Sequence, residues 1–229
     1  MPKGMNLVSS RWSITLLLAT VACGGAGTGA ETAPQPAAAS TAQLEALYRA
    51  RTDSARMRFT EADVRFMTGM IGHHAQALVM SDLAPTHGAS HAIETLAARI
   101  INAQQDEIAT MQQWLRDRGQ PVPEVHITGM TMTVHGPEYA MHMSGMLTPE
   151  QMQELDQAMG REFDRKFLTL MIQHHRGAVT MVHELFATDG AAQDDVVFKL
   201  ASDIQVDQTT EVARMELMLE EMKNAGPGS

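Results

Sequence analysis

Two histidine doublets, each one helical turn after a methionine, are the side chains of this sequence best suited to chemistry. Adjacent residues on a helix point about 100° apart, so a doublet cannot close on one ion by itself, whereas residues three or four positions apart share a side. Thioether sulfur with imidazole, and without thiolate, suits Cu(I) or Ag(I), and imidazoles can also take Cu(II). The predicted soft-metal ligands are Met70, His73, His74, Met171, His174 and His175.

A second group of soft donors lies in the connection between residues 119 and 147. The chain has 19 methionines in 229 residues, and a loop-like segment needs no such density to build a core. Methionines and histidines spaced along a pliable segment could wrap a soft ion, and the alternative is a linker that binds no metal. The candidate ligands there are Met130, Met132, His135, Met141, His142, Met143 and Met146.

Two Gln-x-x-Glu pairs accompany the doublets. Gln104 and Gln208 sit on apolar stripes, where a buried amide needs hydrogen-bond partners. Glu107 and Glu211 follow one turn later and could orient a ligand histidine through its other ring nitrogen. The alternative is that both glutamates are solvated charges on a helix face. Methionines at helical spacing, such as Met181, are interpreted as core packing.

The two doublets belong to an internal repeat. Residues 63–77 match residues 164–178 at eight positions, and residues 104–115 match residues 208–219 after a loop of different length. All four segments have helical periodicity, and Thr60 with Asp63 forms a capping-box-like start. One hairpin cannot cover its own apolar face, but two can cover each other. The sequence therefore predicts an all-α four-helix bundle made of two tandem helical hairpins, and no strand of consequence.

The repeat also sets the expected domain organisation. One domain should span residues 41–229, with repeat 1 at about 60–118, a Met/His-rich connection at 119–147 and repeat 2 at about 148–223. Short additional helices are expected near residues 42–58 and 149–159, packed on the outside of the bundle. The small residues Gly177 and Ala178 are expected to let a second helix come close to the second doublet.

The N-terminus has the layout of an export signal. Lys3 and Arg11 precede an apolar run at residues 14–22, which is too short to span a membrane and ends at Cys23. This predicts a lipoprotein-type signal peptide at residues 1–22, a lipid anchor on Cys23 and a flexible tether at residues 23–40. The alternative is a plain signal peptide that is cut elsewhere. Either reading places the protein in the periplasm or on the outer surface of the cell envelope.

Charge and cysteine content exclude several classes of function. The formal net charge is −10, which repels phosphate backbones and attracts cations, so nucleic acid is not an expected partner. Since Cys23 is the only cysteine, the folded domain has neither disulfides nor thiolate ligands. The expected partners are a metal ion, the membrane through the lipid anchor and either a second copy of the chain or a copper-delivery protein.

The repeated block Met-Ile-x-His-His-x-x-Ala-x-x-Met, followed by Gln-x-x-Glu-[Ile/Val]-x-x-Met, resembles the DUF305 family of exported bacterial proteins. Residues 143–152 also look like the joint between repeats that is typical of this family. The resemblance covers about residues 60–222 and implies a ferritin-like bundle. Because some members are linked to copper resistance, it also implies periplasmic copper binding by the two Met/His-His sets.

Three functions are compatible with these features. The favoured one is a non-enzymatic protein that binds copper, Cu(I) first, for buffering, tolerance or transfer outside the cytoplasm. The alternative enzyme is a ferritin-like metal-dependent oxidase, but its di-iron site would need Glu-x-x-His pairs, which the candidate helices lack. The third is a metal-free helical scaffold of the cell envelope.

Overall fold

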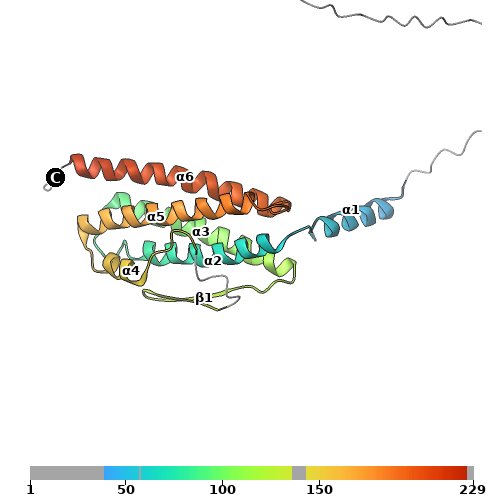
Figure 1. Ribbon diagram of the computed structural model, residues 1–229, viewed down its shortest axis with the longest axis horizontal. Helices are drawn as coiled ribbons and strands as arrows, with labels where there is room; N and C mark the ends of the chain where they lie inside the picture. Colours follow the sequence, from blue (N-terminus) through green and yellow to red (C-terminus); the bar gives the residue numbers. More distant parts are fainter. Residues whose placement is uncertain (1–38, 57, 136–142, 226–229) are drawn as a thin grey trace, which may run out of the picture. The chain divides into compact units, whose positions relative to one another are not determined.

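The computed structural model describes residues 39–56, 58–135 and 143–225, which form six helices and one two-stranded sheet (Figure 1). The predicted signal peptide, most of the tether and the lipidation site Cys23 lie outside these residues. No helix in the described part of the chain is long and apolar enough to cross a membrane. The elements are α1 (Thr41–Arg56), α2 (Glu61–Asp82), α3 (His91–Asp117), β1 (Glu124–Thr128), β2 (Thr131–His135), α4 (Pro149–Asp156), α5 (Gly160–Phe186) and α6 (Asp195–Asn224).

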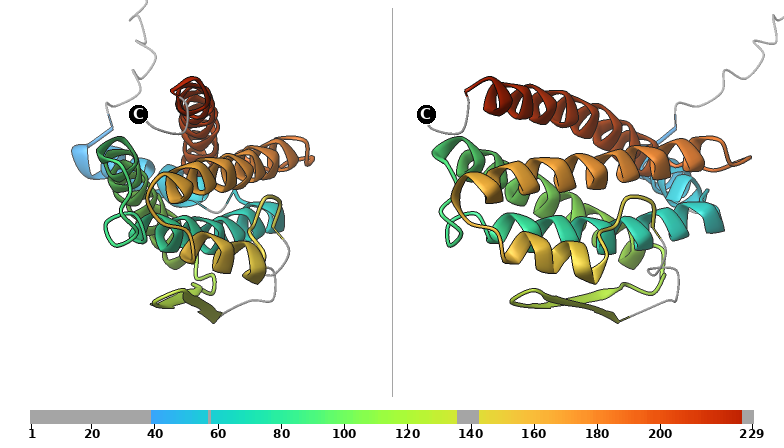
Figure 2. Two further views of the ribbon diagram at one scale, coloured as in Figure 1. Left: turned by 90° about the vertical axis from the view of Figure 1, so that its left-hand side faces the viewer. Right: turned by 60° about the vertical axis from the view of Figure 1, so that its left-hand side comes forward.

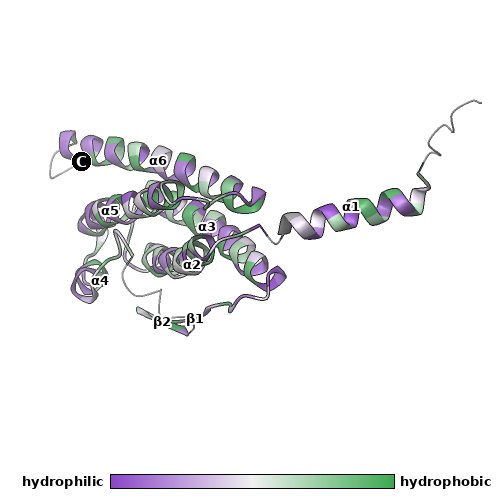
Figure 3. Ribbon diagram, turned by 45° about the vertical axis from the view of Figure 1, so that its right-hand side comes forward, coloured by the Kyte–Doolittle hydropathy of each residue, from purple (hydrophilic) through white to green (hydrophobic). Residues whose placement is uncertain are grey.

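The all-α fold and the two helical hairpins are confirmed. Helix α2 packs along α3, α5 packs along α6, and the two hairpins meet through α2 and α5 (Figure 2). These two central helices are the ones that carry the histidine doublets. Polar and apolar residues alternate along α3, α5 and α6, as expected of helices with one buried face (Figure 3), whereas α2 is buried on nearly all sides.

The helix starts follow the capping chemistry of the sequence. Thr60 accepts a hydrogen bond from the Asp63 amide, and the Asp63 carboxylate accepts one from the Thr60 amide at 2.7 Å. Thr148 and Gln151 form the same reciprocal pair at the start of α4. Each pair satisfies backbone amides that a helix leaves without a partner in its first turn.

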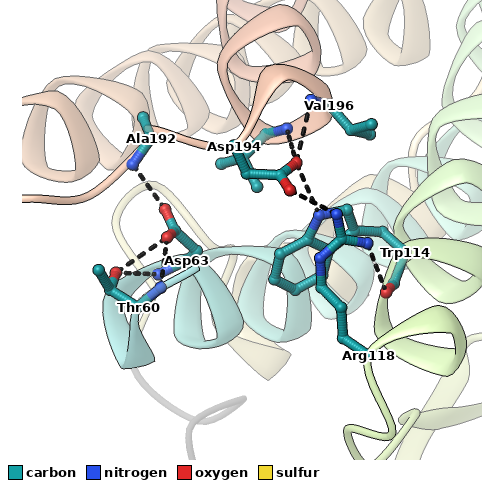
Figure 4. Close-up of polar contacts among 8 residues, drawn as sticks. Thr60, Asp63, Trp114, Arg118, Ala192, Asp194 and Val196 are labelled. Carbon is teal, nitrogen blue, oxygen red and sulfur yellow. Dashed lines mark hydrogen bonds and ion pairs between the residues drawn. The ribbon is translucent and has the colours of Figure 1, made fainter. Parts of the chain in front are cut away.

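The aspartates that begin the repeat also tie each hairpin to the other. Asp63 on α2 accepts a hydrogen bond at 2.7 Å from the amide of Ala192, in the turn between α5 and α6 (Figure 4). Asp164 on α5 accepts one at 3.1 Å from the amide of Ser90, at the start of α3. The two bonds are related by the internal two-fold, so each central helix holds the turn of the opposite hairpin.

Aromatic and ionic contacts join the end of α3 to the start of α6. The Trp114 indole donates to Asp194 at 3.0 Å, and the Arg118 guanidinium, which pairs with the same carboxylate, lies 4.4 Å from the centre of the Trp114 ring (Figure 4). Arg118 and Asp194 are both almost fully buried. Met218 occupies the equivalent position in the second repeat, so this tie between α3 and the start of α6 exists in one half only.

The connection between the repeats contains an antiparallel hairpin, and the prediction that it forms no strand was wrong. Strands β1 and β2 pair from Glu124 opposite His135 to Thr128 opposite Thr131, around a turn at Gly129 with a positive φ of 56°. The period-two alternation is present but covers only five residues in each strand, which is too short to stand out beside the long helices.

The two short helices behave differently. Helix α4 buries Met152 and Leu155 against the bundle, as predicted. In contrast, the described side chains of α1 are exposed except for Thr52, and Tyr48 is 73% exposed. The helix itself is therefore confirmed, but its predicted packing on the bundle is wrong.

Candidate metal centre

Four buried imidazole rings meet where α2 packs against α5. The ring centres of His73 and His174 are 3.8 Å apart, across the boundary between the two repeats. His74 follows His73 at 6.3 Å and His175 follows His174 at 6.2 Å. All four side chains have an exposed fraction of 0%. The two doublets therefore form one continuous row, which we call the imidazole row.

A glutamate ends the row on each side. His74 Nε2 lies 2.6 Å from Glu107 Oε2 within the first hairpin. His175 Nε2 lies 2.7 Å from Glu211 Oε2 within the second. A carboxylate only accepts hydrogen bonds, so each Nε2 carries the hydrogen and the Nδ1 of a neutral ring keeps its lone pair. Both Nδ1 atoms are buried and have no hydrogen-bond partner among the described residues.

The backbone of residues 143–148, which we call the strap, orients a third ring. His73 Nε2 donates to the carbonyl of Ser144 at 3.0 Å, so this ring too keeps its lone pair on a buried, unpartnered Nδ1. The Gln76 side chain donates to the carbonyl of Leu147 at 3.1 Å and accepts from its amide at 2.8 Å. The strap is thus fixed to α2 by both a ring and an amide.

A glycine lets the strap approach α5. A Cβ placed on Gly177 would lie 2.0 Å from the carbonyl oxygen of Ser144 and 2.5 Å from Cα of Gly145. The sequence assigned the small residue at this position to the approach of a second helix, but it is the strap that it accommodates. Gln76 and Gly177 occupy equivalent positions of the two repeats. In the first repeat this position hydrogen-bonds to the strap, and in the second it leaves room for the strap.

Several buried polar atoms have no hydrogen-bond partner among the described residues. Neither ring nitrogen of His174 has a hydrogen-bond partner among the described residues, and the same is true of the amide groups of Gln104 and Gln208. Both glutamines are only 3% exposed. Buried polar groups in proteins nearly always have a hydrogen-bond partner, because an unpaired group loses its hydration without a compensating bond. The unpaired ring nitrogens, which the contacts of the imidazole row bring together, indicate a place that accepts a ligand.

Burial keeps the central rings neutral. Desolvation, followed by the charge of His74, lowers the pKa of His73 to about 3, against the opposing effect of its bond to Ser144. Desolvation and then the charge of His73 also lower the pKa of His174 well below its ordinary value. Both rings are therefore unprotonated at neutral pH, which is the form that binds a metal.

The row is not a closed cage for a metal of high coordination number. In the described part of the chain, no three His, Cys, Asp or Glu side chains are grouped so that they could hold a metal ion. The predicted thioether ligands Met70 and Met171 are fully buried, but they belong to two different apolar clusters. The His73 and His174 rings, by contrast, meet across the two helices with their centres 3.8 Å apart.

Three described methionines of the connection line two separate pockets. Met130 and Met132 line a pocket of about 400 Å³ together with Met152. Met143 lines another, of about 330 Å³, together with Met181. Met181 packs against the apolar core, as interpreted from its spacing. Its side chain and that of Met143 both lie against Gly69, so the two thioethers are neighbours. Of the remaining candidates, Met146 is half-buried in the strap, His135 is exposed on the hairpin, and Met141 and His142 lie outside the described residues.

An acidic groove of about 630 Å³ between α3 and α6 reaches one end of the imidazole row. Glu107 lines this groove and also binds His74. Burial, and then the carboxylates of Glu107 and Asp203, raise the pKa of Asp207, which reflects the density of negative charge there. The five carboxylates of the groove are Asp106, Glu107, Asp195, Asp203 and Asp207.

Residues 63–219 match the sequence model of DUF305, a domain of unknown function. The fold is similar to a DUF305 protein from Streptomyces coelicolor, with 27% identity over 71% of this chain and 94% of that one and a TM-score of 0.59. A DUF305 fragment from Deinococcus radiodurans is 31% identical over 71% of this chain and 98% of that one, with a TM-score of 0.58. CopM in its Cu(I)-bound form is 26% identical over 69% of this chain and 96% of that one, with a TM-score of 0.52. No curated protein matches the chain.

Proposed function

The chain belongs to the DUF305 family, and from this premise we propose that it binds copper outside the cytoplasm, with Cu(I) as the preferred ion. The observation that carries the proposal is the imidazole row, four fully buried rings with five unpartnered nitrogens between two glutamates. An apolar core gains nothing from such a set, whereas a cation gives the lone pairs that it reaches a partner.

The hydrogen bonds of the row favour metal binding over protonation. Three rings donate Nε2–H to Glu107, Glu211 or the strap, which directs their lone pairs to Nδ1. A carboxylate or carbonyl behind a ligand histidine fixes its tautomer and raises its basicity toward the metal. The two glutamates also supply negative charge close to a buried cation, which lowers the cost of its desolvation.

The choice of copper rests on donor type and on a structural neighbour. Imidazole and thioether are the donors available near the row, and they suit soft ions better than Mg or Ca. CopM, at 26–27% identity, has been solved with Cu(I), Cu(II) and silver bound. We therefore expect Cu(I) and Ag(I) to bind most tightly, with Cu(II) as a weaker occupant.

We assign the ligand roles as follows. His73 and His174 are the central ligands, His74 and His175 flank them, and Met70 and Met171 are soft donors that a small movement of α2 or α5 would add. The methionines of the connection, including the Met143 and Met181 pair, provide more exposed thioethers from which an ion can exchange. This arrangement suits buffering, tolerance or transfer of copper by an exported, lipid-anchored protein, with a delivery protein as the receiver.

A competition titration tests the proposal. Metal-free protein is titrated with Cu(I) against a chelator of known affinity, and the titration is repeated with His73→Ala and His174→Ala. His183→Ala is the matched control, because this imidazole lies on α5 but is exposed. We expect loss of the tightest site in the first two variants and no change in the control. Equal affinity in all four proteins would refute the imidazole row as the copper site.

A further inference from the structure

A second imidazole pair lies on the β-hairpin, separate from the imidazole row. The rings of His126 and His135 meet edge to face, with their centres 5.5 Å apart. The carboxylate of Glu124 lies 3.7 Å from Nε2 of His126. The hairpin runs along α2, on the side of the bundle away from α6 (Figures 1 and 2).

The strand register places these three side chains on one face. Glu124 is directly opposite His135, and His126 is two positions further along β1. Residues that are opposite or two apart in a hairpin share a face. The other face carries Val125 and Met132, which pack against the apolar core of the bundle. The packed face holds the hairpin in place while the imidazole face stays open to solvent.

We propose that this outer face binds a divalent cation of borderline softness, the class of Zn(II), Ni(II) and Cu(II), between His126 and His135. The described side chains are not grouped as a preformed three-ligand site, so rotation of the two rings brings one nitrogen of each to the ion. The carboxylate of Glu124 and water complete the coordination.

The donor set separates this site from the one proposed for copper(I). Imidazole with carboxylate suits borderline divalent ions, whereas thioether is the donor that selects Cu(I). His126 and Glu124 are exposed, with side-chain fractions of 63% and 76%, so the ion exchanges directly with solvent. The site requires neither the imidazole row nor the strap, so it can be tested independently of the proposed function.

Zinc and Cu(II) titrations of the metal-free protein test this inference. Calorimetry with Zn(II) is compared for the wild type, His126→Ala, His135→Ala and the control Thr131→Ala, which lies on the same face without a metal-binding group. Each histidine variant should lose at least the roughly 10- to 100-fold affinity that even an outer hydrogen-bond partner of a metal site contributes. The control should bind as the wild type does.

Electron paramagnetic resonance of bound Cu(II) provides a second measurement. The wild type should show coupling to two nitrogens at this site, and either histidine variant should lose one of them. Unchanged zinc affinity in the His126→Ala and His135→Ala variants would overturn the inference, as would loss of zinc binding in His73→Ala and His174→Ala. Loss of Cu(I) binding alone would bear on the proposed function and leave the hairpin site intact. Because both histidines are at the surface, the variants should keep the unfolding midpoint of the wild type.

Discussion

The imidazole rings of His73 and His174 lie with their centres 3.8 Å apart and their planes tilted by 38°, although the two residues belong to different repeats and different helices. The contact exists because α2 and α5 are the two helices through which the hairpins meet. Each ring covers the other, and both are fully buried. The following predictions concern this centre and the contacts that hold it.

Acid should destabilise the metal-free protein. Burial and the charge of His74 lower the pKa of His73 from 6.5 to about 3. Between these two values the unfolded chain takes up a proton that the folded protein does not, so stability is complete above the unfolded pKa and falls as the pH drops. For this one group, the loss between about pH 7 and about pH 5 should be about 2 kcal/mol.

The variant His73→Gln isolates this effect, because its amide can still donate to the carbonyl of Ser144. Urea unfolding at the two pH values should show a smaller loss for this variant than for the wild type. The exposed His183→Gln serves as the reference and should keep the wild-type loss. If His73→Gln and the wild type lose the same free energy, the ring is not held neutral in the folded protein.

Neutralising the glutamates at the ends of the imidazole row should weaken the binding of Cu(I). Glu107→Gln keeps an acceptor for His74 but removes the charge, and the expected loss of affinity is about 10- to 100-fold. Glu211→Gln should act in the same way on the other side. Glu216→Gln, on the exposed part of α6, is the control. The measurement is a competition titration. An equal loss of Cu(I) affinity in the control would show that the net charge of the protein causes the effect.

A methyl group on Gly177 should dislodge the strap. The added Cβ of Gly177→Ala would lie 2.0 Å from the carbonyl of Ser144, and backbone on both sides leaves little room to relax. We expect a loss of about 1–3 kcal/mol in the free energy of unfolding. Gly69→Ala is a graded comparison, because its nearest neighbour, at 3.3 Å, is the flexible side chain of Met143. Since Gly→Ala inside a helix otherwise gains up to about 1 kcal/mol, similar losses in both variants would show that strain common to both helices, and not the strap, governs the effect.

Removing the hydrogen bonds between the hairpins should lower the free energy of unfolding and leave the copper affinity unchanged. Asp63→Ala loses the cap on Thr60 and the bond to the Ala192 amide, for an expected cost of about 1–3 kcal/mol. Asp164→Ala loses the equivalent bond to Ser90. Glu61→Ala, an exposed residue of the same first turn as Asp63, should change little. Faster hydrogen exchange at the Ala192 amide should accompany Asp63→Ala, and unchanged exchange there would contradict the tie.

Much of the fold could be predicted because the evidence for it is local. The repeat and its helical period identified both hairpins, and the capping pair Thr60 and Asp63 marked the start of α2. The outer role of Glu107 and Glu211 could be considered because their spacing from the glutamines repeats. The hairpin at residues 124–135 was not predicted, because two five-residue strands are a weak signal. For the same reason His126, which faces the predicted candidate His135, was not considered.

The sequence by itself determined which side chains share a helix face, because helical geometry relates residues three and four apart wherever the helix lies. It thereby placed soft donors and buried imidazoles on the same two helices and excluded thiolates. Only the tertiary structure decided that His73 meets His174, that Met143 lies beside Met181, and that Gly177 admits the strap. These contacts depend on how two helices pack against each other and on the path of the connection, and spacing within one helix carries no information about either.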